Sequence, residues 1–280
     1  MQPLTQQHFL ALEPQLNQLA RAAGAAIMAV YQRSEALDVT HKADSSPLTE
    51  ADLAAHHILV KGLAPLLDEV PVLSEESQLP SYDVRGSWHR YWLIDPLDGT
   101  KEFVNRNGEF TVNIALIDDG APVLGVVYVP CKDVMYMGNY LTGAFKDTGS
   151  GPVAIHCRQV DAALKADQPI ALVASRNHGA KAVDQLMQKL EKLTGKPVQT
   201  RNMGSSLKLC LVAEGLADLY PRLAPTSEWD TAAAQAIVEA AGGVVVDTDF
   251  KILRYNQKSD ILNPFFYVIG DTRYPWQNLL

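Results

Sequence analysis

The chain of 280 residues is long enough to bury a full hydrophobic core, and its length favours two closely packed subdomains. A hydrophobic content of 47% with 20% charged residues is ordinary for a soluble globular protein. The formal net charge of −8 argues against a nucleic-acid polymer as partner, because such partners usually require a basic surface. A small anionic substrate is compatible with this negative net charge, since a bound metal ion can invert the local charge.

Three widely spaced cysteines, Cys131, Cys157 and Cys210, have neither the paired spacing of a zinc site nor the even number of a disulfide framework. They indicate a reducing, cytoplasmic compartment. The N-terminal segment carries no Lys or Arg before Arg21, which is unlike a signal peptide, and no apolar run is long enough to span a bilayer.

In the first half of the chain, residues 5–32 carry apolar side chains at helical spacing, and Pro14 is expected to divide this helix into two segments. Thr49 and Asp52 match a capping box for a helix over residues 50–62, so Asp52 is interpreted as a helix cap. Asp44 alone is typical of a turn. Apolar runs predict strands at residues 39–42, 70–74, 91–95, 110–117, 123–129, 134–137 and 143–145.

The second half alternates between strand and helix patterns. Strands are predicted at residues 170–174, 198–201, 217–220 and 244–247, and helices at residues 180–193, 206–214 and 231–241. The chain is therefore predicted to be an α+β and α/β layered sandwich. Residues 1–150 would form an antiparallel sheet with helices, and residues 151–280 a smaller α/β subdomain, with the seam at residues 147–151.

The segment of residues 91–100, YWLIDPLDGT, combines a buried strand with two carboxylates. The strand is expected to end at Asp95, because the proline that follows cannot donate to a β ladder. Asp98 comes next, and Gly99 and Thr100 open a short helix. Carboxylates favour a cation and a helix N-terminus favours an anion, so the segment predicts metal-assisted phosphate chemistry.

Two further carboxylates have structural explanations of their own. Glu75 and Glu76 follow the strand over residues 70–74, and a glutamate pair is most often a solvated loop. Asp230 is expected to be the N-cap of the helix over residues 231–241, which explains it fully as a structural residue. Only their combination with Asp95 and Asp98 makes a metal site the better interpretation.

Together these motifs resemble the lithium-sensitive, magnesium-dependent inositol monophosphatase superfamily, which has a sugar-phosphatase-like fold. The chain carries Asp-Pro-x-Asp-Gly-Thr at residues 95–100, Trp-Asp-x-Ala-Ala at residues 229–233, the upstream Glu-Glu pair and a Lys-x-Asp-x-Ser-Pro-x-Thr-x-Ala-Asp segment at residues 42–52. Within the superfamily, Asp-Gly-Thr-Lys-Glu-Phe at residues 98–103 is similar to the bacterial 3′(2′),5′-bisphosphate nucleotidases of the CysQ type. Inositol monophosphatases usually carry Thr-Asn in place of Lys101 and Glu102.

The resemblance implies a role for each motif residue. Two or three Mg²⁺ ions would be held by Glu75, Asp95, the carbonyl of Leu97, Asp98 and Asp230, since Mg²⁺ prefers oxygen ligands. Glu75 and Thr100 would position the attacking water, with Asp44 accepting a hydrogen bond from the Thr100 hydroxyl. Backbone N–H groups of Gly99 and Thr100 would bind the scissile phosphate.

The substrate-binding set implied by the resemblance combines Glu75, Leu97, Asp98, Gly99, Thr100 and Asp230 with five residues around the nucleotide. These are Ser205, Lys208 and Arg222, with Arg176 and His178 on the same rim. Two of them have competing explanations: Lys208 as a solvated helix residue, and Arg222 as a residue that simply flanks Pro221.

The implied activity is Mg²⁺-dependent hydrolysis of the 3′-phosphate of adenosine 3′,5′-bisphosphate to AMP, with the sulfated nucleotide as a further substrate, in sulfur assimilation. One alternative is an inositol- or sugar-phosphate phosphatase, against which Lys101 and Glu102 argue. Another is a non-catalytic metal- or anion-binding protein, against which the complete set of ligands argues. The resemblance also implies peripheral contact with the cytoplasmic face of the inner membrane, which nothing in the composition supports.

Overall fold

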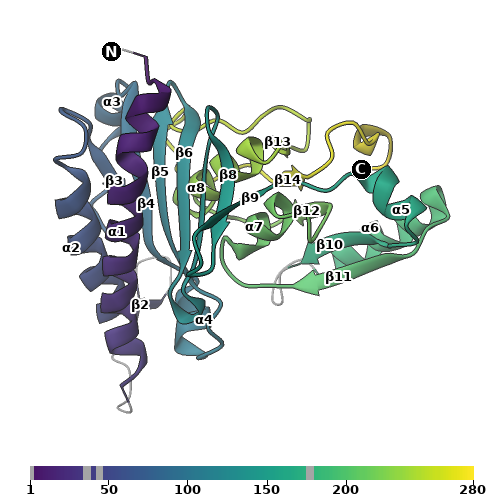
Figure 1. Ribbon diagram of the computed structural model, residues 1–280, viewed down its shortest axis with the longest axis horizontal. Helices are drawn as coiled ribbons and strands as arrows, with labels where there is room; N and C mark the ends of the chain where they lie inside the picture. The colour runs from purple at the N-terminus through teal and green to yellow at the C-terminus, as the bar shows by residue number, and fades with distance from the viewer. Residues whose placement is uncertain (1–2, 34–38, 42–46, 175–179) are drawn as a thin grey trace.

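A computed structural model describes residues 3–33, 39–41, 47–174 and 180–280. Within these ranges the elements stack as layers: a helix pair, a seven-stranded sheet, a second helix pair, a five-stranded sheet and two outer helices (Figure 1). The predicted fold class, a layered α/β sandwich, is confirmed. In the described part of the chain no helix combines the length and the apolarity that a membrane span requires.

The first sheet has the strand order β3-β4-β5-β6-β7-β8-β9, and the pairs are antiparallel except β3 with β4. Helices α1 (Gln6–Tyr31) and α2 (Glu50–Leu63) cover one face of this sheet with a shared apolar cluster. The strands are β3 (Val72–Ser74), β4 (Arg90–Asp98), β5 (Thr111–Asp118), β6 (Ala121–Val129), β7 (Val134–Asn139), β8 (Gly143–Asp147) and β9 (Pro152–Ile155). The connections include the small sheet of β1 (Val39–His41) and β2 (Pro47–Thr49), with α3 (Tyr82–Arg85), α4 (Thr100–Val104) and η1 (Pro130–Lys132).

Helix α1 is continuous through Pro14, so the prediction of two segments was wrong. Proline removes one backbone donor and crowds the preceding turn. The helix nevertheless buries Phe9, Leu12 and Leu16 completely or almost completely around this point. Burial of large apolar side chains contributes roughly 1.5–3 kcal/mol each, which offsets the local cost.

The second sheet has the order β11-β10-β12-β14-β13, with two parallel and two antiparallel pairs. Its strands are β10 (Ile170–Ala174), β11 (Val198–Asn202), β12 (Leu219–Arg222), β13 (Val244–Asp247) and β14 (Phe266–Ile269). Helices α5 (Val160–Lys165) and α6 (Ala180–Thr194) and the turn η2 (Trp276–Asn278) flank its outer face. Sequence patterns missed two four-residue strands, β9, which begins at Pro152, and β14, which begins two residues after Pro264.

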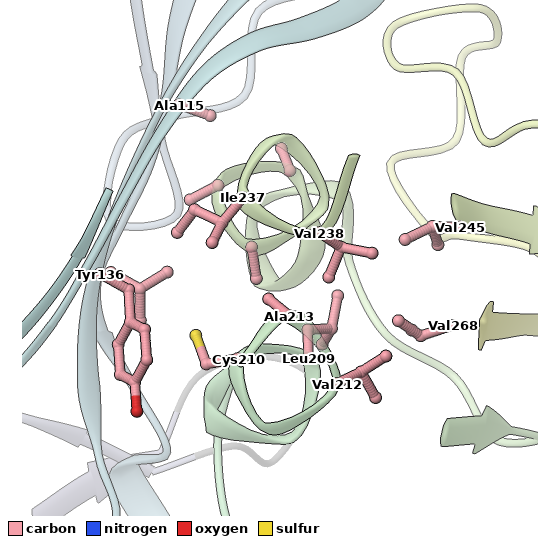
Figure 2. Packing of buried hydrophobic residues seen from close by; sticks show 14 of the residues in the cluster. Ala115, Tyr136, Leu209, Cys210, Val212, Ala213, Ile237, Val238, Val245 and Val268 are labelled. Atoms are coloured by element: carbon pink, nitrogen blue, oxygen red, sulfur yellow. The ribbon is translucent and has the colours of Figure 1, made fainter. Parts of the chain in front are cut away.

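Helices α7 (Leu207–Ala213) and α8 (Glu228–Ala240) lie between the two sheets and join them through one apolar cluster (Figure 2). Ala115 and Tyr136 face these helices from the first sheet, and Val245 and Val268 face them from the second. Gly125 in β6 makes this packing close, because a Cβ there would stand 1.9 Å from the carbonyl oxygen of Ala233. Helix α8 is therefore seated directly on the backbone of the first sheet.

The first sheet continues through β9 to Ile155, beyond the boundary expected at residue 150. Helix α8 belongs to the second half of the chain but packs against the first sheet. The two halves thus share one core, and the division into residues 1–150 and 151–280 stays a proposal.

Candidate active site

Three separate elements bring acidic side chains to one edge of the first sheet. Strand β3 runs parallel to β4, so their carboxyl ends meet, and the backbone N–H of Glu75 donates to the carbonyl of Ile94 at 3.2 Å. Glu75 therefore lies beside Asp95 as a direct result of strand pairing. Parallel pairing next to a proline break is the physical reason that these distant motifs meet.

Strand β4 does not stop at Asp95 as predicted; it continues to Asp98 with a break in register between these two residues. Proline interrupts the ladder, and the Asp95 carboxylate accepts the N–H of Leu97 at 3.0 Å. Pairing resumes between Asp98 and Thr111. The irregular stretch thus presents two carboxylates from one strand.

The third contribution comes from the start of α8. Ser227 is the N-cap and the helix begins at Glu228, so the prediction that Asp230 is the N-cap was wrong. Asp230 occupies the third helical position and its carboxylate accepts the Ser227 N–H at 2.9 Å, closing a capping box. A capping-box acid at this position turns toward the helix start, and here it also faces the sheet edge.

Glu75, Asp95 and Asp230 each place one carboxylate oxygen within 4.8 Å of the others. Burial and the neighbouring carboxylates of Glu75 and Asp98 raise the pKa of Asp95 well above its usual range. Burial and the same two neighbours also raise the pKa of Asp230. We call Glu75, Asp95, Asp98 and Asp230 the carboxylate cluster. Its hard oxygen donors fit a divalent cation such as Mg²⁺, which would relieve the repulsion among these charges.

Thr100 begins α4 directly after Gly99, whose φ of 91° is a left-handed conformation that glycine adopts without strain. The Thr100 hydroxyl lies 3.3 Å from both the Asp52 carboxylate and the Leu97 carbonyl. Asp52 also accepts from the N–H and hydroxyl of Thr49, which confirms the predicted capping box. Asp52 is therefore both a helix cap and the carboxylate partner of Thr100.

A pocket opens next to the cluster and is lined by both Asp98 and Asp230. Its other walls carry Lys208 and Arg222, which we call the cationic rim, together with Ser205. One pocket therefore combines carboxylates that suit a cation with cations that suit a second anionic group.

Lys208 is buried rather than solvated, with only 9% of its surface exposed. Its ammonium donates to the Ser205 carbonyl at 2.7 Å and lies 5.8 Å from the centre of the Tyr220 ring. Burial and the neighbouring Arg222 lower the pKa of Lys208, while Asp98 acts in the opposite direction. Burying a charged ammonium is unfavourable unless an anion compensates it.

Arg222 donates to the carbonyls of Ala224 and Pro225 at 3.1 and 2.8 Å, which fixes its side chain along the pocket. Ser205 is a non-glycine residue in a left-handed conformation, with φ of 46°. Such backbone strain is common where a side chain must be aimed into a site.

Three of the residues implied by the resemblance, Asp44, Arg176 and His178, lie outside the described residues. Their predicted roles remain untested. The other predicted residues meet at the pocket and the adjoining sheet edge.

Sequence reasoning missed the partnership of Asp52 with Thr100, although the capping box had singled Asp52 out. It also missed Tyr220, Thr226, Thr231 and Phe266, which line the pocket. Phe266 belongs to the unpredicted strand β14 and pairs with Arg222. No local pattern in the sequence reveals that pairing, because it joins residues 44 positions apart.

Comparisons with known proteins agree with this geometry. The model of the inositol monophosphatase family matches residues 11–270. The 3′(2′),5′-bisphosphate nucleotidase CysQ of Escherichia coli is 50% identical over 91% of this chain and 98% of its own length. CysQ from Bacteroides thetaiotaomicron, a bacterial member of the inositol monophosphatase family, is 42% identical with a TM-score of 0.76, over 92% of this chain and 97% of that chain.

A more distant structure, the extragenic suppressor protein suhB from Bartonella henselae, shares the fold at 24% identity. Its TM-score is 0.74, over 95% of this chain and 96% of that chain. The chain belongs to the inositol monophosphatase family.

Proposed function

We propose that this chain is a Mg²⁺-dependent phosphomonoesterase that converts adenosine 3′,5′-bisphosphate to AMP and phosphate. The observation that carries the proposal is the shared pocket, in which Asp98 and Asp230 face the same space as Lys208 and Arg222. A metal-dependent phosphatase needs the carboxylates, and a substrate with a second phosphate needs the cations. The relatives named as bisphosphate nucleotidases, at up to 50% identity, support this substrate class.

The carboxylate cluster and the Leu97 carbonyl would hold two or three Mg²⁺ ions. When bound, these ions supply the positive charge that activates water and stabilises the leaving oxygen. Glu75 holds the attacking water in line with the scissile bond. The N–H groups of Gly99 and Thr100 bind the scissile phosphate.

The Thr100 hydroxyl is placed to accept a proton from the attacking water while passing its own proton to Asp52. The 3.3 Å separation of Thr100 Oγ1 and Asp52 Oδ1 supports this relay. Asp44 keeps its predicted role beside Thr100 as a proposal. On the opposite side of the pocket, Ser205, Lys208 and Arg222 bind the second phosphate and ribose, with Arg176 and His178 completing the rim.

Further parts of the proposal rest on the family resemblance. They are removal of the 3′-phosphate from the sulfated nucleotide, a role in sulfur assimilation, inhibition by Li⁺ and contact with the inner face of the membrane. The free cysteines support a reducing compartment such as the cytoplasm. An inositol- or sugar-phosphate substrate is the less favoured alternative, since it does not require the cationic rim.

The test measures phosphate release from adenosine 3′,5′-bisphosphate and from inositol 1-phosphate, each with Mg²⁺ and with a chelator. We expect Mg²⁺-dependent formation of AMP and a clear preference for the nucleotide. For variants that lose a carboxylate of the cluster, Asp119→Asn is the matched control, because the Asp119 side chain is exposed in an ion pair with His89. A preference for the inositol ester would contradict the nucleotide assignment.

A further inference from the structure

Ser206, which immediately precedes α7, contacts the carboxylate cluster from the opposite half of the chain. Its backbone N–H and its hydroxyl both donate to the same oxygen of Asp98, Oδ2, at 2.6 and 2.5 Å. The Ser206 hydroxyl also lies 2.8 Å from the carbonyl oxygen of Asp230. Ser206 is 1% exposed and thus joins two elements of the cluster from within the core.

Asn113, in β5, adds a second layer to this arrangement. Its amide nitrogen donates to Ser206 Oγ at 2.7 Å and lies 3.3 Å from Asp98 Oδ2. Ser206 Oγ accepts this bond, and its single proton has two acceptors, Asp98 Oδ2 at 2.5 Å and the Asp230 carbonyl at 2.8 Å, of which the charged and nearer Asp98 oxygen is the stronger. Thr111 is a weaker neighbour of the same carboxylate oxygen, at 3.5 Å.

All of these donors point to the same oxygen of Asp98. With Oδ2 occupied by protein N–H and O–H groups, Oδ1 is the oxygen left to bind a cation. Hydrogen bonds of this kind fix the orientation of a ligating carboxylate, and their loss typically lowers metal affinity or activity by about 10- to 100-fold.

We propose that Ser206 is a positioning residue that holds Asp98 as a single-oxygen metal ligand, with Asn113 in turn orienting Ser206. The inference rests on the proposed function, in which Asp98 binds a divalent cation. Ser206 touches neither substrate nor the reacting atoms in this account. It acts by fixing the direction of Asp98 and its distance from Asp230.

The experiment compares Mn²⁺ binding to the parent and to Ser206→Ala, measured by electron paramagnetic resonance of the free ion. We expect one class of sites to lose about 10- to 100-fold in affinity while the other sites bind as in the parent. The activity of Ser206→Ala should return toward the parent value at saturating Mg²⁺, and its KM for the nucleotide should equal that of the parent. Ser206→Thr keeps the hydroxyl and should restore much of the affinity.

Two further variants separate this role from a general loss of stability. Asn113→Ala keeps both Ser206 donors and should weaken the same class of sites by a smaller factor, which keeps the proposal testable if Ser206→Ala does not fold. Thr194→Ala removes a hydroxyl that bonds the Leu190 carbonyl at 2.7 Å, far from the cluster, and should leave Mn²⁺ binding unchanged.

Identical Mn²⁺ binding in the parent, Ser206→Ala and Asn113→Ala would overturn this inference and leave the proposed function intact. An equal loss at every class of sites would also overturn it, since that result indicates general destabilisation. Absence of Mn²⁺ binding by the parent itself would instead contradict the proposed function.

Discussion

The carboxylate cluster and the cationic rim face one pocket but differ in how the fold provides their counter-charges. Within the described residues, the cluster gathers carboxylates whose burial and mutual repulsion raise the pKa of Asp95 and Asp230. The rim instead directs its N–H groups partly to backbone carbonyls, as in the bonds from Lys208 to Ser205 and from Arg222 to Pro225. The cluster therefore relies on a bound cation to neutralise its charges, whereas backbone carbonyls already accept some N–H groups of the rim.

This difference separates two functions within one pocket. In the proposed reaction, the cluster would decide whether the reaction proceeds, because the cations it would hold activate water and neutralise charge on the phosphate. The rim would decide which ester is accepted, because it would bind the part of the substrate that does not react. Substitutions in the two regions should therefore have different kinetic signatures.

The largest effect is expected from Asp95→Asn, which removes a charge from the centre of the cluster. Phosphate release should fall by about 10³-fold or more, equivalent to about 4 kcal/mol in the activation barrier. Steady-state kinetics at saturating nucleotide measures it, with Asp119→Asn as the control. A variant that keeps a tenth of the parent rate would show that Asp95 is not central to the cluster.

The same substitution should stabilise the metal-free chain, because it relieves repulsion among buried carboxylates. The folded-state pKa of Asp95 is raised, so the parent loses stability as the pH rises from the ordinary carboxylate pKa of the unfolded chain through that raised value. Denaturant unfolding in a chelator should show Asp95→Asn gaining stability over the parent as the pH rises. In saturating Mg²⁺ the parent should instead be more stable than Asp95→Asn.

Asp52→Asn tests the relay at the edge of the cluster. Asparagine can still accept the Thr49 N–H through its carbonyl oxygen, so the cap on α2 is retained. It is a much weaker proton acceptor, and kcat should fall by roughly 100-fold, the lower range for general acid–base catalysis. An unchanged kcat with an unchanged melting temperature would restrict Asp52 to capping.

Gly125→Ala should have a smaller effect that acts on the cluster through the fold. The added methyl would overlap the Ala233 carbonyl and push α8, with Asp230, away from the sheet. We expect a loss of about 1–3 kcal/mol in the free energy of unfolding, as for other overpacked sites. Chemical denaturation measures this loss, and Mg²⁺ affinity should fall in parallel, whereas a variant as stable as the parent would show that α8 can shift freely.

The sequence was most informative where a residue's role is set by its immediate neighbours. The Asp95–Thr100 segment and the Thr49–Asp52 capping box are local patterns, and the structure places both near the same site. The return of strand pairing at Asp98 could not be predicted, because it depends on packing against Thr111. The early start of α8 follows from the Ser227–Asp230 capping box, a local pattern that the sequence prediction overlooked. Asp52 and Ser206 gain their contacts with Thr100 and Asp98 only after distant segments fold together.

The most direct test of the account is the kcat/KM of the parent and of Lys208→Met for two substrates. One is adenosine 3′,5′-bisphosphate, and the other is adenosine 3′-monophosphate, which lacks the second phosphate. Lys208→Met should lower kcat/KM for the bisphosphate by roughly 10- to 100-fold, as expected for a charged hydrogen bond, and leave kcat/KM for the monophosphate nearly unchanged. An equal loss for both substrates would contradict the assignment of catalysis to the cluster and substrate choice to the rim.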